Sequence, residues 1–335
     1  MNRRLAVALG ALALLLVLAT LATWESYRAF LARPLDVPTE GTTVLVAPGE
    51  TVRTVIRGLE ERGITQVNWQ WRLLTRLNPL TIQVGEYALD AGMRPMDLLQ
   101  RMAAGQVLQH RFTIVEGWNY RQLEAALLAS DVLVVEPANL DPAVVMRRLG
   151  GNDESPEGWF LPETYAVVRG ETGLSLLQRA HQAMQDALEQ VWAGRTDGLP
   201  LATPYQLLIL ASIVEKEAGL AAERAAIAGV LSRRLQQGWK LEADPTVIYG
   251  LGEDFDGDLR SRDLRTDTPW NTYTRRGLPP TPIAMPGRAT LQATAHPDGG
   301  HAMFFVADGK GGHVFSDTLA EHNQAVQALL RQQQK

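Results

Sequence analysis

Two glutamates flank a lysine in the segment SIVEKEAG, residues 212–219, which closes a long apolar stretch. A carboxylate among aliphatic side chains is costly unless it is ion-paired, protonated or used in chemistry. Thr203, Pro204 and Gln206 predict the start of a helix, and Gly219 predicts its end. At about 100° per residue, the two carboxylates leave this helix about 200° apart, so they cannot both point into one site.

The angular positions of the two glutamates about the helix axis predict different surroundings for their carboxylates. Glu215 falls at the edge of a polar seam, whereas Glu217 falls between Leu210 and Ile213. We therefore expect Glu215 to be solvated or ion-paired and Glu217 to have apolar surroundings. Desolvation raises the pKa of a carboxyl group toward working pH, which is what a general acid needs. The residues alone leave open the alternative that both are ordinary charges at the end of a helix.

Other catalytic patterns are missing from the sequence. It contains no cysteine, which excludes a disulfide framework and a thiol nucleophile. No Ser-x-x-Lys, His-Glu-x-x-His or Gly-x-Ser-x-Gly motif occurs. The histidines of the C-terminal part match no metal-site spacing, so we expect no metal and no cofactor. A net charge of −5 and the lack of a basic tail indicate no nucleic-acid partner.

The N-terminal segment predicts a membrane anchor. Arg3 and Arg4 precede an uncharged apolar run over residues 5–24. As a helix, such a run is roughly 30 Å long, the thickness of the hydrocarbon core of a bilayer. The two arginines favour a cytoplasmic tail at residues 1–4 and a single pass, with the rest of the chain outside. A cleaved signal peptide remains the alternative, because Thr20-Leu21-Ala22 is a weak small-x-small exit.

The remaining pattern of short strands and separate helices predicts an α+β fold. Residues 25–42 contain two prolines and no long apolar period, so we expect a linker there. Three strand-turn-helix units are predicted at 42–63, 84–105 and 110–130. Further elements are a mostly helical stretch at 140–203, a helix at 221–238, loops at 240–250 and 277–287, two short strands within 302–316, and a final helix from 318.

Six stretches in the second half of the chain carry a more specific pattern. They are EGWFLPETY (157–165), ASIVEKEA (211–218), ADPTVIYG (243–250), NTYTRRGLPPTPIAMPG (271–287), AHP (295–297) and FFVADGKGGHVFS (304–316). Together they resemble the YceG-like endolytic murein transglycosylases of bacteria. Their order and spacing, the anchor and the module after it resemble the family too, so the resemblance covers nearly the whole chain.

The resemblance implies a lytic enzyme that cuts the MurNAc–GlcNAc bond inside nascent peptidoglycan strands and leaves 1,6-anhydroMurNAc ends. It also implies that Glu217 is the catalytic residue. The implied substrate contacts are Asp244, Thr246, Asn271, Tyr273 and Glu215, with Trp159 and Tyr165 as stacking faces for sugars. For the two stacking aromatics, packing in the core is an equally open alternative.

One carboxyl group suffices for this reaction, because the 6-hydroxyl of the sugar attacks in place of water. Ordinary glycosidases use two carboxyl groups. Two other functions remain open on the residues. A hydrolytic muramidase would use Glu223 or Asp244 to activate water, and a peptidoglycan-binding scaffold would have no catalytic residue at all.

The resemblance also implies a domain order and a cellular place. It divides the chain into a cytoplasmic tail (1–4), a transmembrane anchor (5–24), a linker (25–42), a LysM-like α/β module (43–106) and a mixed α+β catalytic domain (107–335). The catalytic domain would be periplasmic, at the inner membrane of a bacterium. The implied partners are peptidoglycan glycan strands, the membrane and the peptidoglycan synthases (penicillin-binding proteins), with a role as a terminase of glycan elongation.

Overall fold

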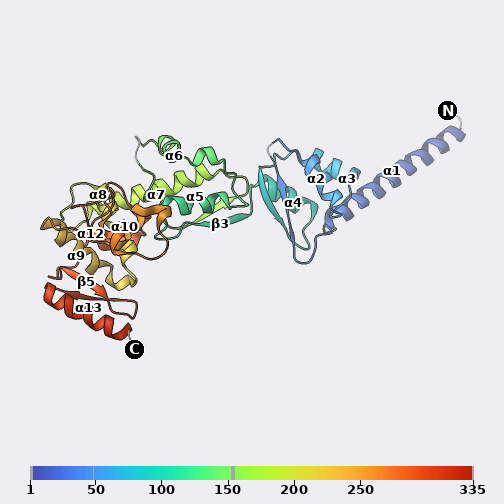
Figure 1. Ribbon diagram of the computed structural model, residues 1–335. Helices are drawn as coiled ribbons and strands as arrows, with labels where there is room; N and C mark the ends of the chain where they lie inside the picture. The colour runs from blue at the N-terminus through green and yellow to red at the C-terminus, as the bar shows by residue number, and fades with distance from the viewer. Residues whose placement is uncertain (1–2, 48, 152–154, 334–335) are drawn as a thin grey trace. The chain divides into compact units, whose positions relative to one another are not determined.

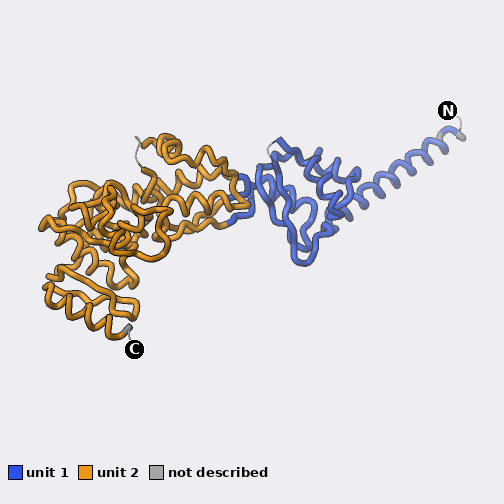
Figure 2. The backbone as a smooth tube through the Cα atoms, viewed as in Figure 1, with its two compact units in different colours: residues 1–110, 168–170 blue, residues 111–167, 171–335 orange. Residues whose placement is uncertain are grey.

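The computed structural model describes residues 3–47, 49–151 and 155–333 (Figure 1). The chain divides into two compact units, one formed by residues 1–110 with 168–170 and the other by residues 111–167 with 171–335 (Figure 2). Helices and short antiparallel strand pairs alternate in both units, which confirms the predicted α+β class.

The first element is a long apolar helix, α1 (Arg3–Ala32). Its stretch from Val7 to Ala32 has a mean hydropathy of 2.3, and its leucines are largely exposed, so length and composition are compatible with a membrane span. The helix continues through the first part of the predicted linker, which corrects that prediction. Tyr27 and Leu35 are only 4% and 6% exposed because they pack into the core of the first unit.

The rest of the first unit is a strand pair covered by helices. Its elements are β1 (Thr42–Val46), α2 (Val52–Glu61), α3 (Trp69–Leu77), β2 (Gly85–Leu89) and α4 (Pro95–Ala103). β1 and β2 pair antiparallel, with Thr42 opposite Leu89 and Val46 opposite Gly85. The sequence did not predict α3, which Asn68 caps and whose Trp71 is buried. The LysM-like character of this unit stays a prediction.

The second unit begins with elements that surround the EGWFLPETY segment. They are β3 (Gln109–Thr113), α5 (Tyr120–Leu128), η1 (Pro137–Leu140), α6 (Pro142–Arg148), β4 (Thr164–Val168) and α7 (Gly173–Ala193). The predicted capping box at the start of α5 is present, because Asn119 accepts from the Gln122 backbone N–H and Gln122 accepts from that of Asn119.

The remaining elements of the second unit are packed around α8 (Pro204–Glu217), which contacts α7, α9, α10 and α12. They are η2 (Ala221–Glu223), α9 (Arg224–Gln236), α10 (Asp244–Leu251), η3 (Gly252–Asp254), α11 (Ser261–Arg265), α12 (Arg288–Ala295), β5 (Phe304–Ala307), β6 (His313–Ser316) and α13 (Leu319–Gln333). The predicted hairpin and final helix are confirmed as β5, β6 and α13. The predicted loop at 240–250 is wrong from Asp244 onward, because Thr246 and Val247 bury one face of α10.

Candidate active site

The burial of α8 fixes where the side chains at its C-terminal end can point. The Thr203 hydroxyl accepts from the Gln206 backbone N–H at 3.2 Å and starts the helix. All eight residues from 207 to 214 are buried, so the helix cannot rotate about its axis without breaking the core. The hydroxyl of Ser212 also accepts from the Ile283 backbone N–H at 3.0 Å, which ties the loop at 277–287 to α8.

Glu215 is fully engaged by groups of the protein. Its carboxylate accepts from the Gly287 backbone N–H at 3.0 Å and from the Thr290 hydroxyl at 2.5 Å. Arg224 lies 3.7 Å from the other oxygen, and the Glu215 side chain is 7% exposed. The ion-paired state expected from the helix geometry is therefore present. The contact with substrate that the resemblance implied for Glu215 would require the carboxylate to leave these partners.

Glu217 is partly buried, and no described residue forms a hydrogen bond with its carboxyl group. Burial first, and then the negative charge of Asp244, raise the pKa of Glu217 to about 8 against the opposing charge of Arg234. Its position as the last residue of α8 also favours a raised pKa, because a helix C-terminus carries partial negative charge. At neutral pH this carboxyl group holds its proton and can donate it.

Asp244 and Tyr273 form a pair beside Glu217. The Tyr273 hydroxyl donates to Asp244 Oδ1 at 2.6 Å, and burial followed by the Asp244 charge raises the pKa of Tyr273 above its usual range. Glu217 contributes to the same shift, which places these three groups in one electrostatic neighbourhood. The structure thus brings together Glu217 with two of the expected substrate contacts.

Thr246 and Asn271 lie behind this pair and are fully buried. The Thr246 hydroxyl donates to the Ala243 carbonyl at 2.7 Å and lies 2.8 Å from the Thr272 hydroxyl. The Asn271 side-chain oxygen accepts from the Tyr273 backbone N–H at 2.8 Å. These side chains have no exposed surface for a sugar in this conformation, and their bonds fix the position of Tyr273 and of the start of α10.

Arg234 is a buried cation near Glu217 that sequence reasoning missed. It donates to the Met303 carbonyl at 2.8 Å and to the Leu241 carbonyl at 2.7 Å, and it pairs with Glu242 at 3.4 Å. Burial lowers the pKa of Arg234, with the nearby acids opposing that shift. The available signal in the sequence was that Arg234 occupies a position of α9 where the helical repeat of apolar residues predicts an aliphatic side chain.

A groove with a volume of about 500 Å³ lies between α5, α8 and α10, and Glu217 and Asp244 are not among its lining residues. Its wall includes Lys216 and Pro245, the sequence neighbours of Glu217 and Asp244. Two aromatic rings, Tyr249 and Trp270, meet edge to face in this wall with centroids 5.5 Å apart. The full lining is Gly117, Asn119, Arg121, Gln122, Glu157, Lys216, Pro245, Ile248, Tyr249, Gly252, Trp270 and Ile283.

Glu157 is a second unusual carboxyl group, and it lines this groove. It is only 3% exposed, and its oxygens accept from the Tyr120 backbone N–H at 3.1 Å and from the Tyr249 hydroxyl at 3.0 Å. Burial raises the pKa of Glu157 to about 7, although these bonds and the Gly158 N–H oppose it. Its place two residues before the aromatic pair in EGWFLPETY was the signal that sequence reasoning did not use.

The two expected stacking aromatics pack inside the unit and do not line the groove. Trp159 stacks on Tyr205 with centroids 5.6 Å apart and planes 10° from parallel. Tyr165 is 8% exposed, and its hydroxyl donates to the Leu161 carbonyl at 2.7 Å. This favours the core-packing alternative over sugar stacking for both rings.

Glu223, the carboxylate named for a hydrolytic alternative, is held by His313. It accepts from the His313 backbone N–H at 2.9 Å and lies 2.8 Å from His313 Nδ1. Neither oxygen of Glu223 is free to activate water in this arrangement. Within the part of the chain that the structure describes, no group of three or more histidine or acidic side chains is placed to hold a metal ion.

Comparison with known proteins identifies the class to which this fold and site belong. The model of the YceG-like family matches residues 44–328, so the chain belongs to the YceG-like family. A crystal structure of a YceG-like protein from Listeria monocytogenes has the same fold, with a TM-score of 0.54 and 26% identity over 86% of this chain and 99% of that one.

Two curated relatives have the same printed name. An endolytic murein transglycosylase of Bacillus subtilis is 28% identical over 318 residues, which are 89% of this chain and 88% of the relative. An endolytic murein transglycosylase of Streptococcus pneumoniae is 24% identical over 328 residues, which are 88% of this chain and 59% of the relative. The chain therefore spans less than two thirds of the pneumococcal protein.

Proposed function

We propose that the chain is a membrane-anchored endolytic murein transglycosylase, a lyase that cuts the MurNAc–GlcNAc bond of peptidoglycan strands and forms 1,6-anhydroMurNAc ends. The observation that carries the proposal is Glu217, a carboxyl group at the end of a rigid helix whose pKa of about 8 keeps it protonated at neutral pH. Membership of the YceG-like family and the names of the curated relatives support the same reaction.

In the first step, the Glu217 proton moves to the glycosidic oxygen, and the bond from this oxygen to C1 of the MurNAc residue breaks. The positive charge that develops at C1 lies near the carboxylate that Glu217 has become. In the second step, the 6-hydroxyl oxygen of the same sugar bonds to C1, and the proton of that hydroxyl returns to Glu217. No water is consumed, and the enzyme is regenerated.

The groove beside Glu217 supplies the surfaces that a glycan strand needs. Tyr249 and Trp270 offer apolar ring faces and edges to the sugars, while Asn119 and Gln122 offer amide groups that can bond hydroxyl or N-acetyl groups. Burial and, to a lesser extent, Asp244 keep Glu217 protonated, and Tyr273 holds Asp244 in place. Thr246 and Asn271 then act by positioning this pair.

A hydrolytic muramidase is the second candidate, because Asp244 is close enough to shift the pKa of Glu217. Two carboxyl groups are what a hydrolase uses. The Tyr273 hydroxyl bonds Asp244 Oδ1 at 2.6 Å and occupies that oxygen in place of a water, which favours the lytic reaction.

The place of action follows from α1. If the apolar helix lies in the inner membrane with a cytoplasmic N-terminus, the second unit lies on the periplasmic side, the compartment in which glycan is polymerised. This supports a role as terminase beside peptidoglycan synthases. Cross-linking of the full chain to these synthases in growing cells tests the partner.

Mass spectrometry of the product ends tests the reaction. The full chain in detergent is incubated with uncross-linked glycan strands, alongside Glu217→Gln and, as a matched control from the same helix, Glu215→Gln. Anhydro ends from the unmutated protein and the control, but not from Glu217→Gln, are expected. Reducing ends would establish the hydrolase instead, and intact strands with every form would leave a binding protein.

A further inference from the structure

Four arginines line a groove in the first unit that the glycan-cleaving reaction does not use. Arg53 and Arg57 lie one turn apart on α2, and Arg72 and Arg76 lie one turn apart on α3. They surround a hollow of about 700 Å³, the arginine groove, whose remaining lining is Ile56, Val67, Trp71 and Thr75. All four arginines are exposed.

The positive charge of this groove has no ion-pair partner among the residues that the structure describes. None of the four guanidinium groups lies within 4.0 Å of a carboxylate among the described residues. The protein as a whole carries a net charge of −5, so the cluster is a local exception. Four like charges around one concave surface repel each other, and an anion that bridges them removes that cost.

The arginine groove lies beside the exit of the apolar helix. Gln70, in the first turn of α3, donates to the Ser26 hydroxyl at 3.2 Å, and the rings of Tyr27 and Trp69 are 6.5 Å apart. Phe30 meets Trp71 edge to face at 5.3 Å. Helix α3 therefore packs against the last two turns of α1, at the C-terminal end of the candidate span.

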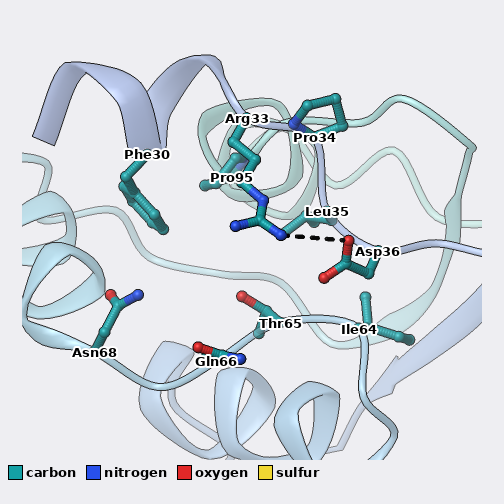
Figure 3. A pocket seen from close by; sticks show the side chains of 10 residues that line it. All are labelled: Phe30, Arg33, Pro34, Leu35, Asp36, Ile64, Thr65, Gln66, Asn68 and Pro95. Carbon is teal, nitrogen blue, oxygen red and sulfur yellow. Dashed lines mark ion pairs between the residues drawn. The ribbon is translucent and has the colours of Figure 1, made fainter. Parts of the chain in front are cut away.

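The end of α1 is seated firmly enough to hold this geometry. Figure 3 shows Phe30 of α1 and Arg33, directly after the helix, facing the segment that carries Thr65 and Asn68 across a hollow of only about 80 Å³. Leu35 and Ile64 are buried in the same core. The end of α1 and the arginine groove thus belong to one compact unit and share its core.

We propose that the arginine groove binds the phosphate groups of anionic phospholipids in the membrane that α1 enters. The planar guanidinium fork matches a phosphate with two parallel hydrogen bonds, and a phosphodiester headgroup presents such oxygens at the bilayer surface. The apolar floor formed by Ile56, Val67 and Trp71 suits the glycerol and upper acyl carbons. The proposal does not depend on which side of the membrane the unit occupies or on glycan cleavage.

Chemical labelling of arginine in the full chain tests the contact without any mutation. The chain is reconstituted in nanodiscs of phosphatidylcholine, with or without phosphatidylglycerol, and phenylglyoxal modification is followed for each arginine by peptide mass spectrometry. We expect labelling of the four groove arginines to slow roughly three-fold or more with phosphatidylglycerol and to recover in about 0.5 M NaCl. Arg147, Arg265 and Arg331, exposed in the second unit, serve as controls whose rates stay unchanged.

Equal labelling rates in both kinds of nanodisc would overturn the proposal, and so would equal slowing at the control arginines. Inorganic pyrophosphate added to phosphatidylcholine nanodiscs tests whether a soluble anion protects the four arginines from labelling. Slowing by pyrophosphate without any effect of phosphatidylglycerol would assign the groove to a soluble diphosphate and also overturn the proposal.

A matched pair of double variants gives an independent measurement. Native mass spectrometry of the full chain in detergent compares retention of phosphatidylglycerol with that of phosphatidylethanolamine. We expect Arg72→Gln with Arg76→Gln to weaken the preference for phosphatidylglycerol by about ten-fold, and Arg147→Gln with Arg265→Gln, which changes the net charge equally, to leave it intact. An undiminished preference in the groove variant, with circular dichroism unchanged, would contradict the proposal.

Discussion

The two sides of the C-terminal end of α8 offer opposite solutions to a buried carboxyl group. On one side, Glu215 has a backbone N–H, a hydroxyl and an arginine, and these stabilise its charge. On the other side, Glu217 has no hydrogen-bond partner among the described residues and faces the carboxylate of Asp244, so its charge is disfavoured. The same residue type two positions apart is thus a structural anion in one case and a proton donor in the other. Environment, and not residue identity, assigns the role.

The comparison predicts that only one of the two glutamates is essential for chemistry. We expect Glu217→Gln to lower the rate of glycan cleavage about 10²- to 10⁴-fold, because the amide cannot donate a proton to the glycosidic oxygen. Glu215→Gln should retain most of the rate per folded molecule. Release of anhydro ends over time, measured by mass spectrometry with the folded fraction from circular dichroism, checks both. A Glu217→Gln enzyme within ten-fold of the unmutated rate would remove Glu217 from the acid role.

For the free energy of unfolding at neutral pH, the order is reversed, and Glu215→Gln should have the larger cost of the two substitutions. Glu215→Gln keeps the shape of the side chain but removes one of the two carboxylates beside Arg224, which also pairs with Glu116 at 3.4 Å, and puts an NH2 group where an oxygen accepted. We expect a loss of about 2–3 kcal/mol in the free energy of unfolding. Urea denaturation of the full chain in detergent at neutral pH measures it, with Glu189→Gln on the exposed face of α7 as the control. An unchanged midpoint for Glu215→Gln would show that its three contacts contribute little.

The helix itself could be predicted, because all its determinants are local. The cap at Thr203 predicts where α8 starts, and the apolar run predicts which face of the helix is buried. The orientation of the helix about its axis is then enough to place Glu215 and Glu217 in different surroundings. The fold class and the C-terminal hairpin followed from the same kind of pattern. The missed helices α3 and α10 are short and depend on burial of Trp71 and Val247 against other elements, which no local pattern reveals.

The groove was beyond sequence reasoning for a related reason. Glu157 takes its high pKa from burial against groups distant in sequence, since its partners Tyr120 and Tyr249 lie 37 and 92 residues away. The aromatics chosen for sugar stacking, Trp159 and Tyr165, had the right chemistry but belong to the core. The resemblance named segments that also contribute residues to the groove, and only the packing distinguishes a groove residue from its buried neighbour.

Stability should also depend on pH through Glu217. Because its folded pKa of about 8 is above the value of an unfolded glutamate, its contribution is fully present below about pH 4.5 and is lost as the pH rises through about 8. Glu217→Gln, which mimics the protonated form, should therefore be more stable than the unmutated chain by about 1–3 kcal/mol at pH 9 and equal to it at pH 5. Urea midpoints at the two pH values test this. A constant difference across the range would contradict the raised pKa.

The smallest expected effect tests the cause of that raised pKa. Activity of the unmutated enzyme should fall as the pH rises past about 8, since Glu217 must be protonated to act. Asp244→Asn removes a negative charge beside Glu217, which makes ionisation easier and should move this alkaline limb to lower pH by roughly one unit. The pH profile of kcat/KM measures the limb, and Asp186→Asn, a loss of the same charge on the exposed face of α7, is the control. Because burial is the larger cause of the raised pKa, the alkaline limb of Asp244→Asn should stay above the range of an ordinary glutamate. A limb near pH 4.5 would assign the whole pKa shift to the charge of Asp244. A limb that does not move would assign the shift to burial alone.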